Sequence, residues 1–533
     1  MAKPSRSTST APSTTGTAAP PVNPESVRRH QWLLGAICFL AGAAIMVIEI
    51  AANRLLSPLF GNSVYTWTSL IGVILISFSV GGYLGGWLTD KRADFALLGW
   101  LLAGAAVMTF FIPAIHAVVA PGRTDAGLIA GPLIVSVLVF AIPGVLLGAI
   151  SPASVRLYSS LQKDAHVGFA AGTISMLGSL GSFVGTFLTG FFLLGTFGVK
   201  AIFLGSGAVL LVLAGLAFLA ARQPVVTQLP VWISALIAGA LGGTADLHSK
   251  PIEGMKTLFE HDSFYHRVLV QEVGEGSFAR RYLNLDSTQE GGMEVQSGEV
   301  FMAYQEYWRV PQLKEDFKLD RALFLGAGAF GMPEAVSREW PRSEVDVVEI
   351  DPVVIEAGRQ FFKLNEHPRV HAYADDARRF LRQAGEKRYD MIFGDAYNGV
   401  QAIPVHLASQ EFFQLVKDRL TPHGIFVMNA ITALEGSKSE LLAGMLATLK
   451  SVFPHVEVCA VGGGARMAQN VILIASQDDW EPVLTRQDYV PGSPSYRLTR
   501  AYVPALRLPK NGVVFTDDFN PVDAIIARGL RDD

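Results

Sequence analysis

The sequence predicts an α-helical transmembrane bundle followed by an α/β domain built on a parallel sheet, with a small β-hairpin subdomain between them. Three observations predict this division. The chain has 533 residues, of which 50% are hydrophobic and only 17% charged, and this is too apolar for a wholly soluble protein. Apolar runs of about twenty residues, long enough to cross a bilayer, are confined to the first half. The second half instead alternates short β-like runs with amphipathic helices.

The composition changes along the chain indicate four regions. Residues 1–30 are rich in Ser, Thr, Pro and Ala and cannot bury enough apolar surface to order, so we expect a disordered tail. Residues 31–250 form the transmembrane bundle of six or seven spans. Residues 251–315 form the β-hairpin subdomain, and residues 316–533 form the catalytic domain.

Seven apolar runs are candidate spans, and the last of them is shorter than the others: 31–51, 66–88, 95–119, 127–150, 168–194, 198–221 and 229–247. Lys and Arg are concentrated in the segments that are cytosolic when the N-terminus is inside, so a cytoplasmic N-terminus is favoured in a multi-pass protein of the cell membrane. Six spans return the chain to the cytosol, whereas seven leave the α/β half on the other side. We expect a cytoplasmic catalytic domain, with the side decided by residues 229–247.

Charge and cysteine content exclude several classes of protein. The net charge of −4 lacks the basic excess that nucleic-acid binding requires. Cys38 lies in an apolar helical run and Cys459 in a strand of the second half, which argues against a disulfide and against a cysteine metal site. The histidines are scattered without the spacing of a zinc site, so no metal is expected.

The second half reads as a hairpin followed by alternating strands and helices. Runs 264–273 and 280–286 are rich in β-branched and aromatic residues and are separated by a Gly-containing turn. Alternation of strands with helices indicates a parallel sheet covered on both faces, where ligands bind beyond the carboxyl ends of the strands. The expected strands are 322–328, 345–351, 369–374, 389–395 and 424–430.

Candidate ligand-binding residues stand at those strand ends. In "LGAGAFG", Gly326, Gly328 and Gly331 fall between a strand and a helix and allow close approach of the backbone to a nucleotide. Glu349 closes the next strand about twenty residues later, where an acid accepts hydrogen bonds from ribose hydroxyls. Together they predict a nucleoside site.

Two further acidic positions follow the next strands. Asp376, after Asp375, can contact an adenine amine or cap the helix that begins at Ala377, and the two roles are compatible. Asp395 ends the apolar run "YDMIFGD" and is expected to face the same crevice. An NAD enzyme and an S-adenosyl-type transferase share all of these features.

The order of "YLNLDSTQ", "AYQE", "LGAGAFG", "VVEID", "ADDA" and "GDAYNG" resembles the spermidine synthase (polyamine aminopropyltransferase) family, in its membrane-fused branch. The resemblance implies a Rossmann-like catalytic domain of the class I methyltransferase type. It implies decarboxylated S-adenosylmethionine as co-substrate, no metal, a small diamine such as putrescine as acceptor, and a homo-oligomer. It further implies that Glu349 holds the ribose, that Asp376 and Ala377 line the adenine site, and that Asp395 accepts the proton of the amine.

The amine side of the site departs from the family pattern. The residues expected there are His266, Tyr304, Gln305, Tyr397 and Asn398. An acid usual in the Gly-rich turn is Ala329 here, and a second acid usual after the fourth strand is Asn398. Three functions therefore stay open: an aminopropyltransferase in the membrane, another S-adenosyl-dependent transferase with a different acceptor, and a non-catalytic polyamine transporter or sensor on the same scaffold.

Overall fold

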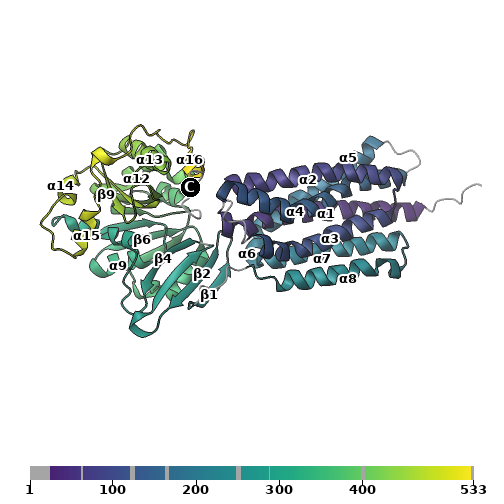
Figure 1. The fold of residues 1–533 in the computed structure, drawn as a ribbon, viewed down its shortest axis with the longest axis horizontal. Coiled ribbons are helices and arrows are strands. Elements are labelled where there is room, and N and C mark those ends of the chain that lie inside the picture. Colours follow the sequence, from purple (N-terminus) through teal and green to yellow (C-terminus); the bar gives the residue numbers. More distant parts are fainter. Residues whose placement is uncertain are drawn as a thin grey trace, which may run out of the picture.

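In a computed structural model, a helical bundle and an α/β domain lie end to end along the long axis of the molecule (Figure 1). This confirms the predicted fold class. The structure describes residues 24–61, 64–120, 127–161, 167–247, 254–286, 288–397 and 403–529.

Within the described residues, the bundle contains seven helices that are long and apolar enough to cross a membrane. The run 229–247, doubtful in the sequence, lies mostly within the last of them, α8. The fifth crossing is α5, which continues through a π-helical turn, Thr189–Leu193, into α6. The helices are α1 (Pro24–Phe60), α2 (Val64–Lys91), α3 (Phe95–Val119), α4 (Gly127–Ser160), α5 (Val167–Leu188), α6 (Leu194–Thr196), α7 (Val199–Ala220) and α8 (Val225–Thr244).

The first helix starts earlier than the sequence predicts. It begins at Pro24, so residues 24–30 are helical and do not belong to a disordered tail. Proline is well suited to the first helical position because its backbone angle is already helical and its missing N–H has no partner there in any case. Glu25 in the first turn adds a favourable charge at the positive end of the helix.

Small residues bring the helices into backbone contact. A methyl group at Gly81 or Gly85 of α2 would overlap backbone atoms of Val145 or Ala149 in α4, and Gly181 of α5 meets the carbonyl oxygen of Phe39 in the same way. Such contacts are typical of membrane helices, where close packing replaces the hydrophobic effect.

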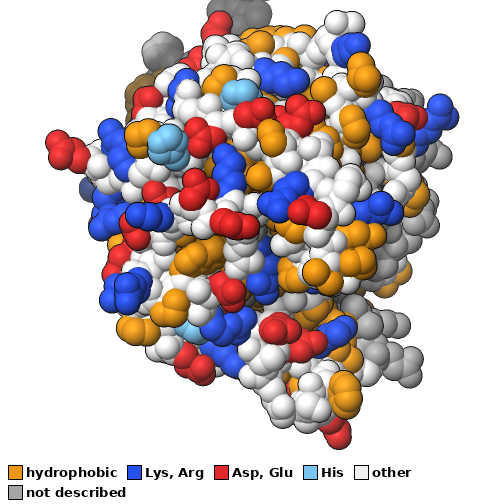
Figure 2. Space-filling model, turned by 90° about the vertical axis from the view of Figure 1, so that its left-hand side faces the viewer, with side chains coloured by type: hydrophobic (Ala, Val, Ile, Leu, Met, Phe, Trp, Pro, Cys, Tyr) orange, Lys and Arg blue, Asp and Glu red, His pale blue; other side chains and the backbone are white. Residues whose placement is uncertain are grey.

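The surfaces of the two halves differ as expected for lipid and water. Large apolar side chains are exposed on the outside of the bundle, among them Leu75, Ile76, Phe183, Leu219 and Leu236. The end of the α/β domain farthest from the bundle instead carries acidic and basic side chains interspersed with one another (Figure 2), which is typical of a solvated surface.

The seven crossings put the first helical residue and the α/β domain at opposite ends of the bundle (Figure 1). If the bundle spans a membrane, a cytosolic N-terminus and a cytosolic α/β domain therefore exclude one another. The sequence left the side of the α/β domain to residues 229–247, and these lie mostly within the seventh helix.

The β-hairpin subdomain is larger than the predicted hairpin. It is a four-stranded antiparallel sheet in the order β1-β2-β3-β4, whose middle pair corresponds to the runs identified in the sequence. The strands are β1 (Lys256–Asp262), β2 (Arg267–Val273), β3 (Arg280–Leu285) and β4 (Thr288–Glu294), and the 3₁₀ segment Ala303–Leu313 follows.

The α/β domain contains a seven-stranded sheet in the order β10-β11-β9-β8-β5-β6-β7. Strands β5 to β9 are parallel to one another. Strand β11 pairs antiparallel with both β9 and β10 and forms with β10 an antiparallel edge that the sequence did not reveal. The strands are β5 (Arg321–Leu325), β6 (Glu344–Glu349), β7 (Val370–Ala374), β8 (Tyr389–Gly394), β9 (Leu420–Thr432), β10 (His455–Val461) and β11 (Gln469–Ser476).

Helices cover both faces of this sheet, so its strands are apolar on both sides. In β5 the side chain of Leu323 belongs to one core and that of Phe324 to the other, as expected for a period of two. The helices are α9 (Gly331–Glu339), α10 (Pro352–Phe361), α11 (Ala377–Gln383), α12 (Gln410–Arg419), α13 (Glu440–Lys450), α14 (Glu481–Leu484), α15 (Pro494–Arg500) and α16 (Val522–Gly529).

Candidate functional site

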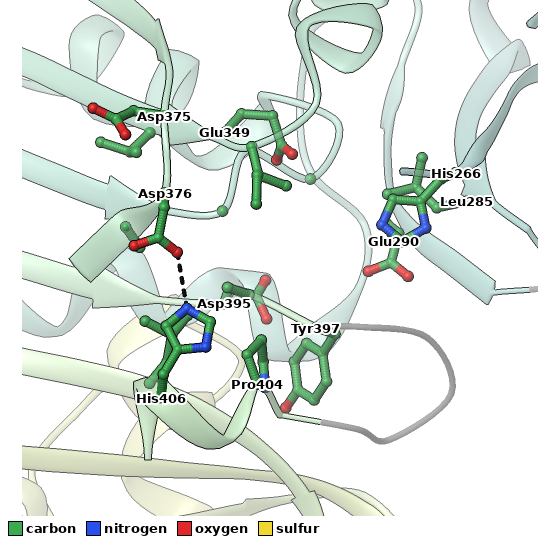
Figure 3. A pocket seen from close by; sticks show the side chains of 17 residues that line it. His266, Leu285, Glu290, Glu349, Asp375, Asp376, Asp395, Tyr397, Pro404 and His406 are labelled. Carbon is green, nitrogen blue, oxygen red and sulfur yellow. Dashed lines mark hydrogen bonds and ion pairs between the residues drawn. The ribbon is translucent and has the colours of Figure 1, made fainter. Parts of the chain in front are cut away.

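A pocket opens between the small antiparallel sheet and the carboxyl ends of β5, β6, β7 and β8 (Figure 3). This is the edge at which open α/β sheets bind ligands. Residues from all of these elements line it: His266, Leu285, Glu290, Gly326, Gly328, Val348, Glu349, Ile350, Asp375, Asp376, Ala377, Asp395, Ala396, Tyr397, Pro404, His406 and Leu407.

Asp395 is held at the mouth of the sheet by strand pairing. Its backbone N–H donates to the carbonyl oxygen of Leu325 at 2.9 Å, which continues the β5–β8 ladder by one residue. Gly326 follows Leu325 with a φ of +97°, and any side chain at that position would overlap the backbone of Asp395. Because Gly326 has no side chain, the chain can turn after β5 next to the backbone of Asp395, and the carboxyl group of Asp395 lies in the pocket.

The carboxyl group of Asp395 has two polar neighbours. Asn429 of β9 donates from Nδ2 to Oδ1 at 2.9 Å, and the hydroxyl of Tyr304 lies nearby. Burial raises the pKa of Asp395 to about 6, although these two polar neighbours act to lower it. An acid with such a pKa is ionised near neutral pH and still has appreciable proton affinity.

Glu290 is a second acid of the pocket, and the sequence interpretation missed it. In the β3–β4 pairing Leu283 faces Gly291 and Asn284 faces Gln289, so Glu290 is the extra residue of a β-bulge. Bulges next to active sites redirect a side chain, and here the carboxyl group points into the cavity between His266 and Tyr397 (Figure 3). Burial, followed by the nearby charges of Asp395 and Glu349, raises the pKa of Glu290 well above its ordinary value.

Glu349 ends β6 and is 8% exposed. Its two carboxylate oxygens accept hydrogen bonds from the backbone N–H groups of Ala327, at 3.1 Å, and Asp351, at 3.0 Å. These bonds fix the carboxyl group between the Gly-rich turn and the start of α10. Burial raises its pKa, and the two N–H donors oppose that rise.

Asp376 caps a helix, which is one of the two roles considered for it, and also lines the pocket. One oxygen caps α11 by accepting from the backbone N–H of Arg379 at 2.9 Å, and the other lies 2.8 Å from Nε2 of His406. Burial acts to raise its pKa, but these partners lower it overall. Ala377, the first residue of α11, lines the pocket beside it.

The predicted amine-side residues occupy different positions. His266 and Tyr397 line the pocket, and the Tyr397 hydroxyl is fixed by donating to the carbonyl oxygen of Asn429 at 2.9 Å. Tyr304 lies behind the lining, where its hydroxyl donates to the carbonyl oxygen of Glu290 at 3.2 Å. Asn398 lies outside the described residues.

Two predicted positions are away from the lining. Gln305 is 1% exposed, and its side chain packs against Gly291, in the neighbouring strand, because the 3₁₀ segment turns it inward. Gly331 opens α9 and packs against Val300, so its small size serves helix packing rather than contact with a ligand in this pocket.

Two lining or supporting residues, in addition to Glu290, were not identified from the sequence. His406 approaches from the 3₁₀ turn Val405–Leu407 and contacts Asp376. Asn429 contacts Asp395, and a signal for it existed, because a single amide interrupts the apolar strand "GIFVMNA". Among the described residues, no group of three or more His, Cys, Asp and Glu side chains has the arrangement of a metal site.

The electrostatic character of the pocket is acidic. Five carboxyl groups line it, opposed by two histidines and by no lysine or arginine among the lining residues: Glu290, Glu349, Asp375, Asp376 and Asp395 face His266 and His406. Such a cavity favours a cationic ligand, because each carboxylate is better accommodated next to a positive charge than next to another acid.

The comparison with protein families agrees with this site. Residues 303–462 match the spermine/spermidine synthase domain, a range that includes Gly326, Glu349, Asp376 and Asp395. A polyamine aminopropyltransferase of Vibrio vulnificus (strain CMCP6) is 36% identical over 138 residues, which are 26% of this chain and 44% of that protein. The chain thus spans less than half the length of this relative.

Two further relatives differ in how much they match. Polyamine aminopropyltransferase 2 of Aquifex aeolicus (strain VF5) is 24% identical over 430 residues, which are 77% of this chain and 81% of that protein. The human eEF1A lysine and N-terminal methyltransferase is 33% identical over 165 residues, which are 29% of this chain and 23% of that protein. The likeness to this aminopropyltransferase is therefore too long to be confined to the α/β half, whereas the match to the methyltransferase is much shorter.

Proposed function

We propose that this chain is a polyamine aminopropyltransferase that transfers the aminopropyl group of decarboxylated S-adenosylmethionine to a diamine such as putrescine. The observation that carries the proposal is Asp395, an acid with a pKa of about 6 in a pocket lined by carboxyl groups, at a sheet edge within the region that matches the spermine/spermidine synthase domain. Both substrates are cations, as this pocket requires.

The proposed reaction is a displacement at carbon. The amine nitrogen forms a bond to the aminopropyl carbon while the carbon–sulfur bond breaks and its electron pair stays on sulfur, which leaves neutral methylthioadenosine. An ammonium has no lone pair, so a proton must leave before attack. Asp395 is proposed to accept that proton, a role for which an acid with a raised pKa is suited.

The nucleoside half of the site is proposed to use the residues identified at the strand ends. Gly326 and Gly328 let the backbone approach the donor, Glu349 accepts hydrogen bonds from the ribose, and Asp376 with Ala377 lines the adenine side. Glu349 keeps acceptor capacity for this role because each carboxylate oxygen has a second lone pair beyond its backbone N–H.

The amine half is proposed to use Glu290 in place of the acids that are missing at Ala329 and Asn398. Glu290 and His266 lie side by side in Figure 3, on the side of the cavity formed by the small sheet, and Tyr397 lies near Asp395 and Pro404. A carboxylate next to an aromatic ring is a suitable environment for an alkyl ammonium.

The function is tested by calorimetric titration of the detergent-purified protein with decarboxylated S-adenosylmethionine and with S-adenosylmethionine. Incubation with putrescine and mass analysis of the products follow. We expect the protein to prefer the decarboxylated donor, because an acidic pocket disfavours the carboxylate that S-adenosylmethionine carries. We expect spermidine as the product. Preference for S-adenosylmethionine, with methylated products, would instead support the methyl-transfer function of the human relative.

The orientation in the membrane is part of the proposal. Among the described residues, basic side chains are more numerous at the N-terminal end of the bundle than at the end next to the α/β domain. Those at the N-terminal end are Arg28, Arg29, Lys91, Arg92, Arg156 and Arg222, and those at the α/β end are Arg54 and Lys200. Positive residues are retained in the cytosol. We therefore propose a cytosolic N-terminus and, across seven helices, an α/β domain that faces away from the cytosol.

Cysteine labelling in intact cells tests this orientation. The native Cys38 and Cys459 are buried, so an introduced cysteine is expected to dominate the signal. Leu506→Cys places a thiol on the α/β domain at a residue 89% exposed, and Val226→Cys places one at the opposite end of the bundle. We expect a membrane-impermeant maleimide to label Leu506→Cys in intact cells and Val226→Cys only after permeabilisation. The reverse pattern would refute the proposed orientation.

A further inference from the structure

Arg54 belongs to the first membrane helix but makes its polar contacts in the α/β half. It lies in the last turns of α1, and its side chain is 9% exposed. Nη1 donates to the carbonyl oxygen of Tyr265 at 2.7 Å and lies 3.6 Å from Oδ1 of Asp286. Both partners are in the small antiparallel sheet or its turns, more than 200 positions later in the chain.

Asp286 connects this arginine to the pocket. Its Oδ2 lies 3.1 Å from Nδ1 of His266, and its Oδ1 accepts the backbone N–H of Arg267 at 3.0 Å. Burial acts to raise the pKa of Asp286, but the hydrogen bond from His266, the charge of Arg54 and the N–H of Arg267 lower it overall. Asp286 is therefore an ionised carboxylate shared between the membrane helix and a pocket residue.

The turn that carries His266 is also fastened to its surroundings. The ring of Phe264 packs directly over Gly195 of α6, where a side chain on that glycine would overlap it. The hydroxyl of Ser263 accepts the backbone N–H groups of Tyr265 and His266 and hydrogen-bonds to Asp351 at the start of α10. The turn is thus clamped between the bundle and the nucleoside-binding edge.

We infer that Arg54 is a positioning residue for the amine side of the pocket, acting on His266 through Asp286 and the Tyr265 carbonyl. An imidazole that contacts only a movable carboxylate can adopt several ring orientations. When a guanidinium fixes the carboxylate from its other side, the imidazole can adopt few. With Nδ1 directed to Asp286, the remaining ring nitrogen of His266 is available to the pocket. The membrane bundle is in this way part of the active site. This inference rests on the proposed function only for the identity of the ligand.

The test measures acceptor and donor parameters of Arg54→Gln in the full-length protein. We expect the KM for putrescine to rise roughly tenfold, with kcat and the affinity for methylthioadenosine nearly unchanged. In a His266→Gln background the same substitution is expected to have no further effect, because the residue it positions is gone. Arg54→Lys should recover part of the loss. Arg92→Gln is the matched control, since Arg92 pairs with Asp94 at the far end of the bundle.

Hydrogen exchange separates this inference from the proposed function. In Arg54→Gln the amides of residues 263–270 and 283–286 are expected to exchange faster, with no change elsewhere in the α/β domain. If the wild type transfers no aminopropyl group, the proposed function is refuted. Faster exchange in Arg54→Gln would still support the positioning role of Arg54. Unchanged exchange and unchanged KM in a transfer-competent protein, or additive effects of Arg54→Gln and His266→Gln, would overturn the positioning.

Discussion

Asp395→Asn is expected to lower kcat for aminopropyl transfer by about 10²–10⁴-fold, the usual contribution of a general base, while methylthioadenosine binds as in the wild type. The substitution preserves shape, and an asparagine oxygen can still accept the hydrogen bond from Nδ2 of Asn429. The negative charge and the ability to take a proton are lost. Single-turnover measurements at saturating donor and diamine isolate this step from binding.

The wild-type rate is expected to depend on pH through the same group. Because the pKa of Asp395 is raised to about 6, the carboxylate is protonated below that pH, and kcat/KM should fall about tenfold for each further unit of acidification. In Asp395→Asn this limb of the profile should vanish. A mutant that keeps both wild-type turnover and the acid limb would refute the assignment of Asp395.

Stability provides an independent readout of the same substitution. A carboxyl whose pKa is raised on folding binds protons more tightly in the native than in the unfolded state, so its contribution to stability falls as pH rises above its unfolded value of about 4 and is unfavourable near neutral pH. Removing the charge is therefore expected to raise the Tm by about 2–4 °C. A loss of turnover accompanied by a lower Tm would indicate misfolding instead.

Glu290→Gln is the matched control for this carboxyl replacement. It removes an ionisable carboxyl group from the same pocket at a residue proposed to bind the diamine but not to accept its proton. We expect a higher KM for putrescine with kcat changed far less than in Asp395→Asn. Equal losses of kcat in the two variants would mean that the acids act as a pair and that the separate roles are wrong.

The sequence predicted those features that depend on local pattern. Asp395 and Glu349 could be located because each ends an apolar run, and parallel strands bring their carboxyl ends to one edge of the sheet. The fold class followed from the lengths and periods of the apolar runs. Glu349 was also marked by its distance from the Gly-rich turn, a spacing that reflects one strand, one helix and the next strand.

The features that the sequence did not predict depend on long-range contacts. Glu290 reaches the pocket through a bulge, and its strand "TQEGGME" lacks the β-branched residues that mark a strand. Gln305 was assigned to the ligand because of its motif, but the direction of a 3₁₀ turn buries it. Arg54 lies near the end of the first apolar helix, and nothing in the sequence around it points to its partner Asp286.

Glu349→Ala is expected to weaken methylthioadenosine binding by about 100-fold, because hydrogen bonds to a charged acceptor contribute about 1.5–3 kcal/mol each. Its kcat at saturating donor should change little, since Asp395 is intact. Titration calorimetry measures the affinity directly. The control is Glu344→Ala, which makes the same change at the other end of the same strand, where the acid is exposed and pairs with Arg369 and His371.

The structural cost of Glu349→Ala has to be separated from the loss of the ligand. The substitution also leaves the N–H groups of Ala327 and Asp351 without their acceptor, and these groups shape the Gly-rich turn and the start of α10. Glu349→Gln keeps one acceptor oxygen for these two N–H groups and turns an amide NH2 group toward the other, so we expect methylthioadenosine binding between that of Glu349→Ala and that of the wild type. Putrescine binding is expected to be unaffected in both variants, because Glu290 and His266 are intact. Loss of putrescine binding as well would indicate a defect of the framework.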